Sequence, residues 1–356
     1  MSFKLFITST FSILLFISCK RETIIPPQVI TVVPYETFVV NEGSFLGNNA
    51  SVTHISKDGV LTEDPYFDAN GFPLGDVLQS FTAYNDRGYA VLNNSAKVEV
   101  FNLQTFVHEA TITGCDYPRY FLPVSSTKAY LTNGSLGGEV DIIDLGSNTI
   151  TGTIVVGNGP EGLASFGTKV FVCNGGGWSF DNTVSVIDAG TDTVIETIDV
   201  GDRPQQAVVD KEGNLWVLCS GEILYDINFI VMGHTPAMMY KIDAVTFDVL
   251  TTAQIGAEGD HPIRLAVSGD GDFVYYENNG VYRVDVVGGD LAGSLLISGA
   301  HYGMGVHSES GDIWTADPSD FTNNSVIRRH DALGVQLEEI QAGIGCLLYT
   351  SPSPRD

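Results

Sequence analysis

One short pattern recurs along most of the chain and restricts its fold more than any other feature. It has the form Val-x-Val-x-Asp, in which apolar residues alternate with others and a short polar residue closes the run. The copies span residues 52–56, 98–102, 140–144, 184–188, 239–243, 281–285 and 327–331. Their last residues are 42 to 46 positions apart, except for one spacing of 55. Spacings of about 40–50 residues are typical of the four-stranded blades of a β-propeller, so the copies predict seven blades.

The segments around each copy also have the features of short strands. A second alternating run follows and ends in Gly, as at 149–157 and 193–201. In several repeats the next run begins with Pro: Pro118, Pro160, Pro204 and Pro262. The last run of each repeat ends in a short polar residue: Asn41, Asn93, Asn133, Asn174, Ser220, Asn278 and Asp317. Alternation with period two, together with punctuation by Gly, Asn and Asp, predicts β-strands rather than helices.

Four short strands cannot bury either face of their own sheet, whereas sheets packed around a closed ring cover both faces. We therefore expect an all-β, seven-bladed β-propeller of four-stranded antiparallel blades over residues 35–345. The chain enters this ring at residues 35–41 with the second strand of blade one. The innermost strand of that blade must then come from the C-terminus.

The C-terminal segment resembles a sequencing adaptor rather than a natural strand. Residues 346–356 match, codon by codon, the translation of a transposase sequencing adaptor, and such additions are excluded from fold reasoning. We expect this segment to be an artefact of library construction. Blade one should then lack its closing strand because of C-terminal truncation.

The N-terminus has the features of an export signal. Lys4 precedes an apolar run at 5–17, which has the length of a signal-peptide core and is too short to span a bilayer. Residues 16–19, Phe-Ile-Ser-Cys, resemble a bacterial lipobox, in which the cysteine is lipidated. We expect a lipoprotein signal peptide over 1–18, lipidation at Cys19 and a lipidated tether over 19–34. The alternative is an ordinary signal with an incidental Cys.

The charge balance restricts the partners of the protein. The chain has 43 Asp and Glu against 17 Lys and Arg, a formal net charge of −26. Binding to nucleic-acid phosphates or to anionic lipid headgroups needs a basic surface. We therefore expect no nucleic-acid partner, and contact with a membrane only through the N-terminal lipid.

Candidate ligand-binding residues lie where face loops are expected. In a propeller, the loops between second and third strands share a face with the loops between blades, and ligands usually bind there. Asn41 ends a strand near this face, with hydrogen bonding within a turn as the alternative. Residues that vary after the blade-opening position are stronger candidates: Arg119, Tyr120, Glu161, Gln205, Arg264 and Tyr302. Aromatic residues of the face loops are further candidates: Phe45, Trp178, Tyr225 and Phe229.

The one long spacing places an insertion at about 221–236, which we expect to reach over a ligand. Rigid aromatic rings beside amide and guanidinium groups suit a large, flat, amide-bearing molecule. The alternative is that Arg119 pairs with a neighbouring carboxylate and that Trp178 covers a blade edge.

Catalysis and metal binding find little support in the sequence. The histidines show no His-x-x-x-His spacing, and there is no Gly-x-Ser-x-Gly motif. Asp270 and Asp272 lie in a turn that lacks the further oxygen ligands of a calcium loop. Cys173 and Cys219 take equivalent positions in adjacent blades, too far apart for a disulfide. We expect a binding protein with no cofactor, no metal site and no catalytic residues.

Several stretches carry a family resemblance. Residues 38–52 (FVVNEGSFLGNNASV), 71–80 (GFPLGDVLQS) and 183–201 (TVSVIDAGTDTVIETIDVG) are among them. With their neighbours they resemble the YncE-like seven-bladed propeller lipoproteins of Gram-negative outer membranes. Some members of that group are similar to surface propellers that capture cobalamin on a TonB-dependent corrinoid transporter.

The resemblance implies a surface-exposed outer-membrane lipoprotein that binds a corrinoid such as cobalamin, with a TonB-dependent transporter as partner. Two other functions stay open. One is a protein-interaction scaffold in an envelope complex. The other is an enzyme of the lactonase or quinoprotein kind, which rests on analogy of fold alone.

Overall fold

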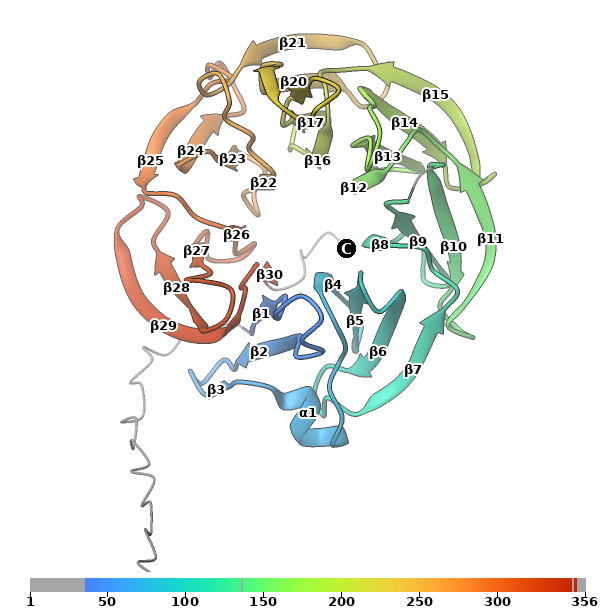
Figure 1. Ribbon diagram of the computed structural model, residues 1–356, viewed down its shortest axis with the longest axis vertical. Helices are drawn as coiled ribbons and strands as arrows, with labels where there is room; N and C mark the ends of the chain where they lie inside the picture. The colour runs from blue at the N-terminus through green and yellow to red at the C-terminus, as the bar shows by residue number, and fades with distance from the viewer. Residues whose placement is uncertain (1–35, 136, 348, 351–356) are drawn as a thin grey trace, which may run out of the picture.

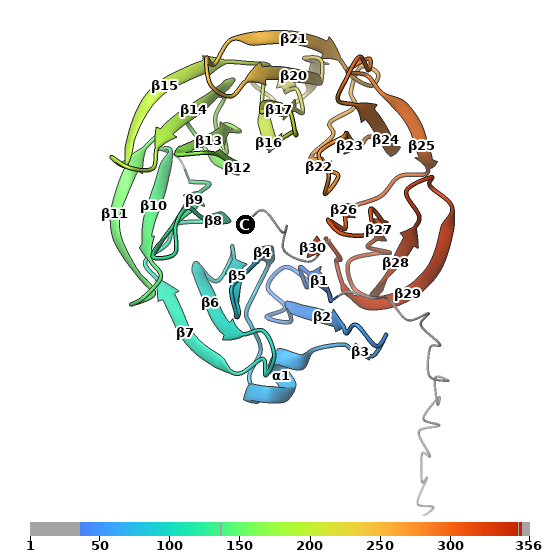
Figure 2. The same ribbon diagram turned by 180° about the vertical axis from the view of Figure 1, so that it is seen from behind.

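The computed structural model describes residues 36–135, 137–347 and 349–350. Over this part of the chain, seven four-stranded antiparallel sheets form a ring (Figure 1). The first strand of each blade faces the centre and the last strand forms the outer rim, as the reverse view also shows (Figure 2). The predicted all-β seven-bladed propeller is confirmed.

Blades two to four use consecutive strands. Blade two contains β4 (Leu78–Tyr84), β5 (Arg87–Leu92), β6 (Lys97–Asn102) and β7 (His108–Thr113). Blade three contains β8 (Pro118–Pro123), β9 (Lys128–Asn133), β10 (Glu139–Asp144) and β11 (Thr149–Val155). Blade four contains β12 (Pro160–Phe166), β13 (Lys169–Asn174), β14 (Thr183–Asp188) and β15 (Thr193–Asp199).

Blades five to seven complete the ring up to blade one. Blade five contains β16 (Pro204–Val209), β17 (Asn214–Cys219), β20 (Met238–Asp243) and β21 (Val249–Gln254). Blade six contains β22 (Arg264–Val267), β23 (Phe273–Glu277), β24 (Gly280–Asp285) and β25 (Ser294–Ser298). Blade seven contains β26 (Gly303–Val306), β27 (Ile313–Asp317), β28 (Asn324–His330) and β29 (Gln336–Ile344).

The burial of the second strands shows why the ring is needed. β5, β9, β13 and β17 are buried at every position except the first. Side chains that point to both faces of a sheet can be buried together only when another sheet covers each face. The apolar clusters therefore cross from blade to blade: Phe171 of β13 and Val217 of β17 belong to one cluster.

Blade one corrects one prediction. It contains β1 (Thr37–Asn41), β2 (Ser51–Ile55), β3 (Leu61–Thr62) and, at the inner edge, β30 (Tyr349–Thr350). Ahead of β30, Leu347 is buried and its N–H donates to the Val40 carbonyl over 2.8 Å. The expectation that this blade lacks a closing strand is wrong. The free edge of β1 offers unpaired backbone groups, and the extended segment after β29 pairs with them.

Two elements lie outside the blades. The insertion predicted at 221–236 is present as a two-stranded hairpin, β18 (Ile223–Tyr225) and β19 (Val231–His234). A short helix that we did not predict, α1 (Pro65–Asn70), connects blade one to blade two. Asp64 caps its first turn by accepting from the Phe67 N–H, and Gly71 ends it with φ of 74°.

Cys173 and Cys219 are buried free thiols, as expected, and Cys115 is a buried free thiol as well. The predicted signal peptide at 1–18, the predicted lipidation site Cys19 and the predicted tether at 19–34 all lie outside the described residues. Within the described part of the chain, no helix has the length and apolar character needed to cross a bilayer.

Candidate functional site

A hollow of about 420 Å³ opens on the face that carries the loops between second and third strands. Its lining comes from loops and strand ends of the first five blades: Phe45, Asn93, Asn94, Tyr117, Arg119, Gly134, Glu161, Gly177, Trp178 and Arg203. Four residues singled out from the sequence meet here, namely Phe45, Arg119, Glu161 and Trp178. Two come from face loops and two from the starts of inner strands.

A repeated backbone irregularity explains the direction of the inner-strand residues. Directly after the opening residue, the pairing of the first with the second strand shifts register in blades two to five. The residues that lie in these irregular segments include Gln79, Arg119, Glu161 and Gln205. A bulged residue is left out of the ladder, so its side chain is turned away from the usual alternation.

Arg119 is the centre of the polar floor of the hollow. Its Nε donates to Glu161 Oε2 over 2.8 Å, and its Nη1 donates to Gln79 Oε1 over 2.5 Å. Burial acts to lower the pKa of Arg119, but the combined effects of Glu161, Tyr120 and Glu42 outweigh burial, so the pKa is raised. Glu161 is only 7% exposed, and removing one partner of such a pair is costly, so the contact with Arg119 stabilises the site. The alternative that Arg119 pairs with a carboxylate is therefore what the geometry shows, within the hollow itself.

In blades two to five, the residue before the blade-opening position adopts a left-handed backbone conformation. The φ angles are 59° at Val77, 53° at Tyr117, 51° at Gly159 and 54° at Arg203. This conformation is uncommon for residues other than Gly and often marks functional positions. Tyr117 and Arg203 both line the hollow, and the sequence analysis did not single them out. In the sequence, both residues are marked by their position directly before a blade-opening proline, Pro118 or Pro204.

Three exposed aromatic residues line the hollow, namely Phe45, Tyr117 and Trp178. Trp178 is 80% exposed and Phe45 is 73% exposed. The loop that carries Trp178 is fixed by its backbone: Ser179 N–H donates to the Gly176 carbonyl over 2.7 Å, and Arg203 Nη2 donates to the Gly177 carbonyl over 3.3 Å. An exposed indole on a fixed loop can stack on a flat ligand at little entropic cost.

A second polar group lies beyond the hollow, where blades one, six and seven meet. The Tyr302 hydroxyl donates to Glu42 Oε2 over 2.7 Å. The Arg264 guanidinium lies 5.7 Å from the centre of the Tyr302 ring, and its Nε donates to the Tyr302 carbonyl. Burial raises the pKa of Glu42, against the lowering effects of Tyr302 and the two arginines Arg264 and Arg119. Glu42 links this group electrostatically to the floor of the hollow.

The remaining sequence candidates lie elsewhere. Asn41 is buried and donates to Ser51 and Thr53 on the neighbouring strand, so it stabilises the blade. Tyr120 lines smaller hollows of about 250 and 150 Å³ deeper in the ring. The amide of Gln205 lies next to Gly175, beside the side chain of Glu161.

Tyr225 and Phe229 belong to the hairpin β18–β19 and do not line the hollow. The expectation that this insertion reaches over the ligand site is therefore not matched by the lining of the hollow. Both rings are exposed.

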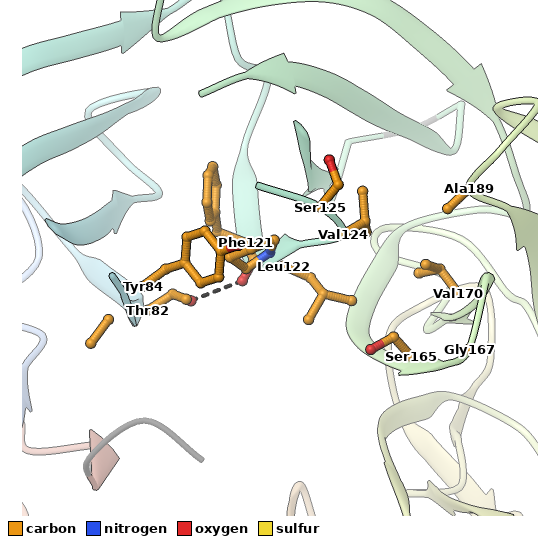
Figure 3. Close-up of a pocket in the computed structure, with 12 residues that line it drawn as sticks. Thr82, Tyr84, Phe121, Leu122, Val124, Ser125, Ser165, Gly167, Val170 and Ala189 are labelled. Carbon is orange, nitrogen blue, oxygen red and sulfur yellow. Dashed lines mark hydrogen bonds between the residues drawn. The ribbon is translucent and has the colours of Figure 1, made fainter. Parts of the chain in front are cut away.

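A further hollow of about 350 Å³ lies between blades two, three and four, where the first strands end (Figure 3). Thr82, Phe121 and Ser125 are among its lining residues, and the Thr82 hydroxyl donates to the Phe121 carbonyl over 2.8 Å (Figure 3). None of its described lining residues carries a charge. The two hollows therefore differ in chemistry, since only the first combines exposed aromatic rings with guanidinium and carboxylate groups.

Among the residues that the structure describes, no group of three or more His, Cys, Asp or Glu side chains could hold a metal ion. The fold and the site together define a seven-bladed β-propeller with a hollowed loop face. A family model described as a domain of unknown function, DUF5074, matches residues 35–286. This match covers more than half of the sequence, and the protein belongs to the DUF5074 family. No curated protein matches the sequence.

Three solved structures illustrate the likeness of fold. A candidate 6-phosphogluconolactonase from Bacteroides fragilis is 13% identical, with a TM-score of 0.64, over 90% of this chain and 99% of that one. A quinoprotein alcohol dehydrogenase-like protein from Bacteroides thetaiotaomicron is 14% identical, with a TM-score of 0.63, over 88% and 78%. Kuenenia stuttgartiensis hydrazine synthase is 15% identical, with a TM-score of 0.56, over 73% and 84%. At these identities the comparisons establish the fold alone.

Proposed function

We propose that this protein is a cell-envelope lipoprotein that binds a small molecule in the hollow lined by Phe45, Tyr117, Arg119, Glu161, Trp178 and Arg203. The observation that carries the proposal is the combination of an exposed, fixed indole with a partly buried Arg119–Glu161 pair in one concave site. Concave sites with aromatic walls and a few oriented polar groups are typical of ligand pockets.

The ligand that suits this chemistry is a large, flat molecule with amide groups, and a corrinoid such as cobalamin is the specific candidate. Trp178 and Phe45 offer apolar surface to a ring system. Asn93, Asn94 and the Arg119–Glu161 pair offer donors and acceptors to side-chain amides. The resemblance to surface cobalamin-binding propellers supports the same ligand.

In this proposal, the protein is anchored through Cys19 at the outer-membrane surface and passes the corrinoid to a TonB-dependent transporter. It acts as a binding protein without catalysis and without a resident cofactor. The quinoprotein-like and lactonase-like solved structures share its fold, and a shared fold alone does not support a shared activity.

Isothermal titration of the full chain in detergent with cyanocobalamin tests the proposal. We expect saturable binding with one site per chain and a Kd well below about 10 µM, which corresponds to roughly 7 kcal/mol or more. Adenosine and haem serve as control ligands that are flat but carry few or no amide groups. An absence of heat with cyanocobalamin would remove the corrinoid, and equal binding of all three would remove the amide-based selectivity.

A further inference from the structure

The hairpin β18–β19 is the most apolar exposed part of the described chain. Ile227 at its turn is 96% exposed and Phe229 is 85% exposed. Leu224, Tyr225 and Met232 are also exposed, so apolar side chains cover the strands as well as the turn. An isolated two-stranded hairpin is marginal in water, and contiguous exposed apolar surface marks an interaction site. Folding of the propeller does not account for these side chains.

The base of the hairpin is firmly attached to the propeller. Thr235 N–H donates to the Glu222 carbonyl over 2.9 Å, and Glu222 N–H donates to Thr235 Oγ1 over 2.7 Å. Glu222 also pairs with Arg203 over 3.1 Å. On the other side, His234 and His261 are hydrogen-bonded to each other over 2.9 Å. The apolar tip is therefore presented from a fixed position, which lowers the entropic cost of docking.

The charges around the hairpin are acidic. Residues 221–236 contain no Lys or Arg; Glu222 is buried and paired with Arg203, so the net charge of the hairpin comes from Asp226. Glu258 is exposed, and Asp260 lies on the same neighbouring loop, the one that contributes His261. Backbone N–H groups of Ile230 and Asn228 lower the pKa of Asp226, so it stays charged near neutral pH.

We infer that the hairpin β18–β19 is a docking site for a protein whose contact surface is apolar at its centre and carries Lys or Arg at its rim. Charge complementarity selects this occupant. An anionic lipid surface would be repelled by the acidic rim, and a second copy of this chain would bring two acidic rims together. The inference does not depend on the identity of any small-molecule ligand.

Arg203 connects this surface to the hollow. Its guanidinium contacts Glu222 at the base of the hairpin and the Gly177 carbonyl next to Trp178. A partner docked on the hairpin would therefore lie beside the ligand site. Such a position suits a protein that receives what the hollow holds.

Site-specific photo-cross-linking of the full chain in cells that produce it tests the inference. The photo-reactive residue p-benzoylphenylalanine replaces Ile227 in one variant and Leu333 in the control. Leu333 is 74% exposed and lies in the turn between β28 and β29. We expect a protein adduct from position 227 only, whose cross-linked peptide, identified by mass spectrometry, has apolar residues flanked by Lys or Arg.

Two further measurements sharpen the test. When Phe229→Asp is combined with the photo-reactive residue at position 227, the yield of the adduct should fall about tenfold or more, as expected for the loss of a central apolar contact. Leu333→Asp in the same background should leave the yield unchanged. Raising the salt concentration from about 0.05 to 0.5 M should also lower the affinity of the purified complex several-fold. Because both positions are exposed, each variant should keep the urea midpoint of the parent.

Four outcomes would overturn the inference. They are an adduct with lipid, an adduct with a second copy of this chain (twice the chain mass), a partner peptide rich in Asp and Glu, and no adduct from position 227. Failure of cyanocobalamin binding would leave the expected cross-linking result unchanged, so the two proposals can fail separately.

Discussion

We expect the Trp178→Ala substitution to weaken ligand binding while leaving the fold intact. Trp178 is 80% exposed, and its loop is held by backbone hydrogen bonds that do not involve the indole. Exposed side chains away from such contacts change stability by less than about 0.5 kcal/mol. Urea unfolding, followed through the buried Trp216 and Trp314, should therefore show the midpoint of the parent.

The expected loss of affinity follows from the area that a ligand would cover. A Trp side chain buries about 150–250 Å², most of which is still exposed at this position, and burial is worth about 25 cal/mol per Å². Subtracting about 1 kcal/mol for ordering leaves a contribution of about 2–4 kcal/mol. The Kd for cyanocobalamin should rise roughly 30- to 800-fold in calorimetric titration.

A matched variant separates stacking in the hollow from general loss of aromatic surface. Phe229→Ala removes a ring that is just as exposed but lies on the hairpin β18–β19. It should leave the Kd within about twofold of the parent, as expected for a residue outside the site. Equal losses from both variants, or an unchanged Kd in Trp178→Ala, would refute the assignment of the hollow as the ligand site.

Two further predictions concern stability. Arg119→Met and Glu161→Leu should each lower the free energy of unfolding by about 2–3 kcal/mol, because each leaves a partly buried charge without its partner. The double variant should lower it by at least about 1 kcal/mol less than the sum of the two single losses. Additive losses in urea unfolding would contradict a stabilising interaction between Arg119 and Glu161. Burial lowers the pKa of His307 from 6.5 to about 4, despite the opposing effects of nearby carboxylates. Burial of neutral His307 is compatible with full stability above pH 6.5. As the pH falls from 6.5 through 4, up to about 3 kcal/mol of the free energy of unfolding is lost, because the unfolded chain binds a proton at this histidine more readily than the folded chain does. His307→Asn should flatten this part of the stability profile, and an unchanged pH slope would count against it.

The architecture could be predicted from the sequence because every blade of a propeller has the same strand pattern and the same need to bury apolar side chains. The first apolar residue of every Val-x-Val-x-Asp copy is buried in the core, so the alternation and the spacing of the copies persist from blade to blade. The long spacing also located the hairpin β18–β19. The helix α1 occurs once, between blades, and no repeat could reveal it. Its signals were local, namely the cap Asp64 followed by Pro65.

The candidate site was only partly predictable. Arg119 and Glu161 differ from the residues at equivalent positions of other blades, and this difference is visible in the sequence. The role of Asn41 depends on Ser51 and Thr53, which face it across the sheet, so its burial could not be inferred from its own position. Arg203 became visible only when the left-handed backbone before Pro204 placed its side chain.

The length of an insertion does not reveal the direction in which its hairpin points. Tyr225 and Phe229 lie on an insertion of the expected size, yet the hydrogen bonds at its base hold it away from the hollow. The closing strand of blade one was missed for a related reason. An unpaired strand edge accepts any extended segment that reaches it, and the sequence of residues 346–350 gave no sign of this pairing.

Hydrogen exchange of the full chain, with and without cyanocobalamin, locates the bound ligand on the propeller. We predict slower exchange at residues 43–49 and 175–182, which carry Phe45 and Trp178, and no change at residues 124–127 and 166–168 beside the hollow between blades two to four. Protection confined to the latter segments, or none anywhere at saturating ligand, would contradict this prediction.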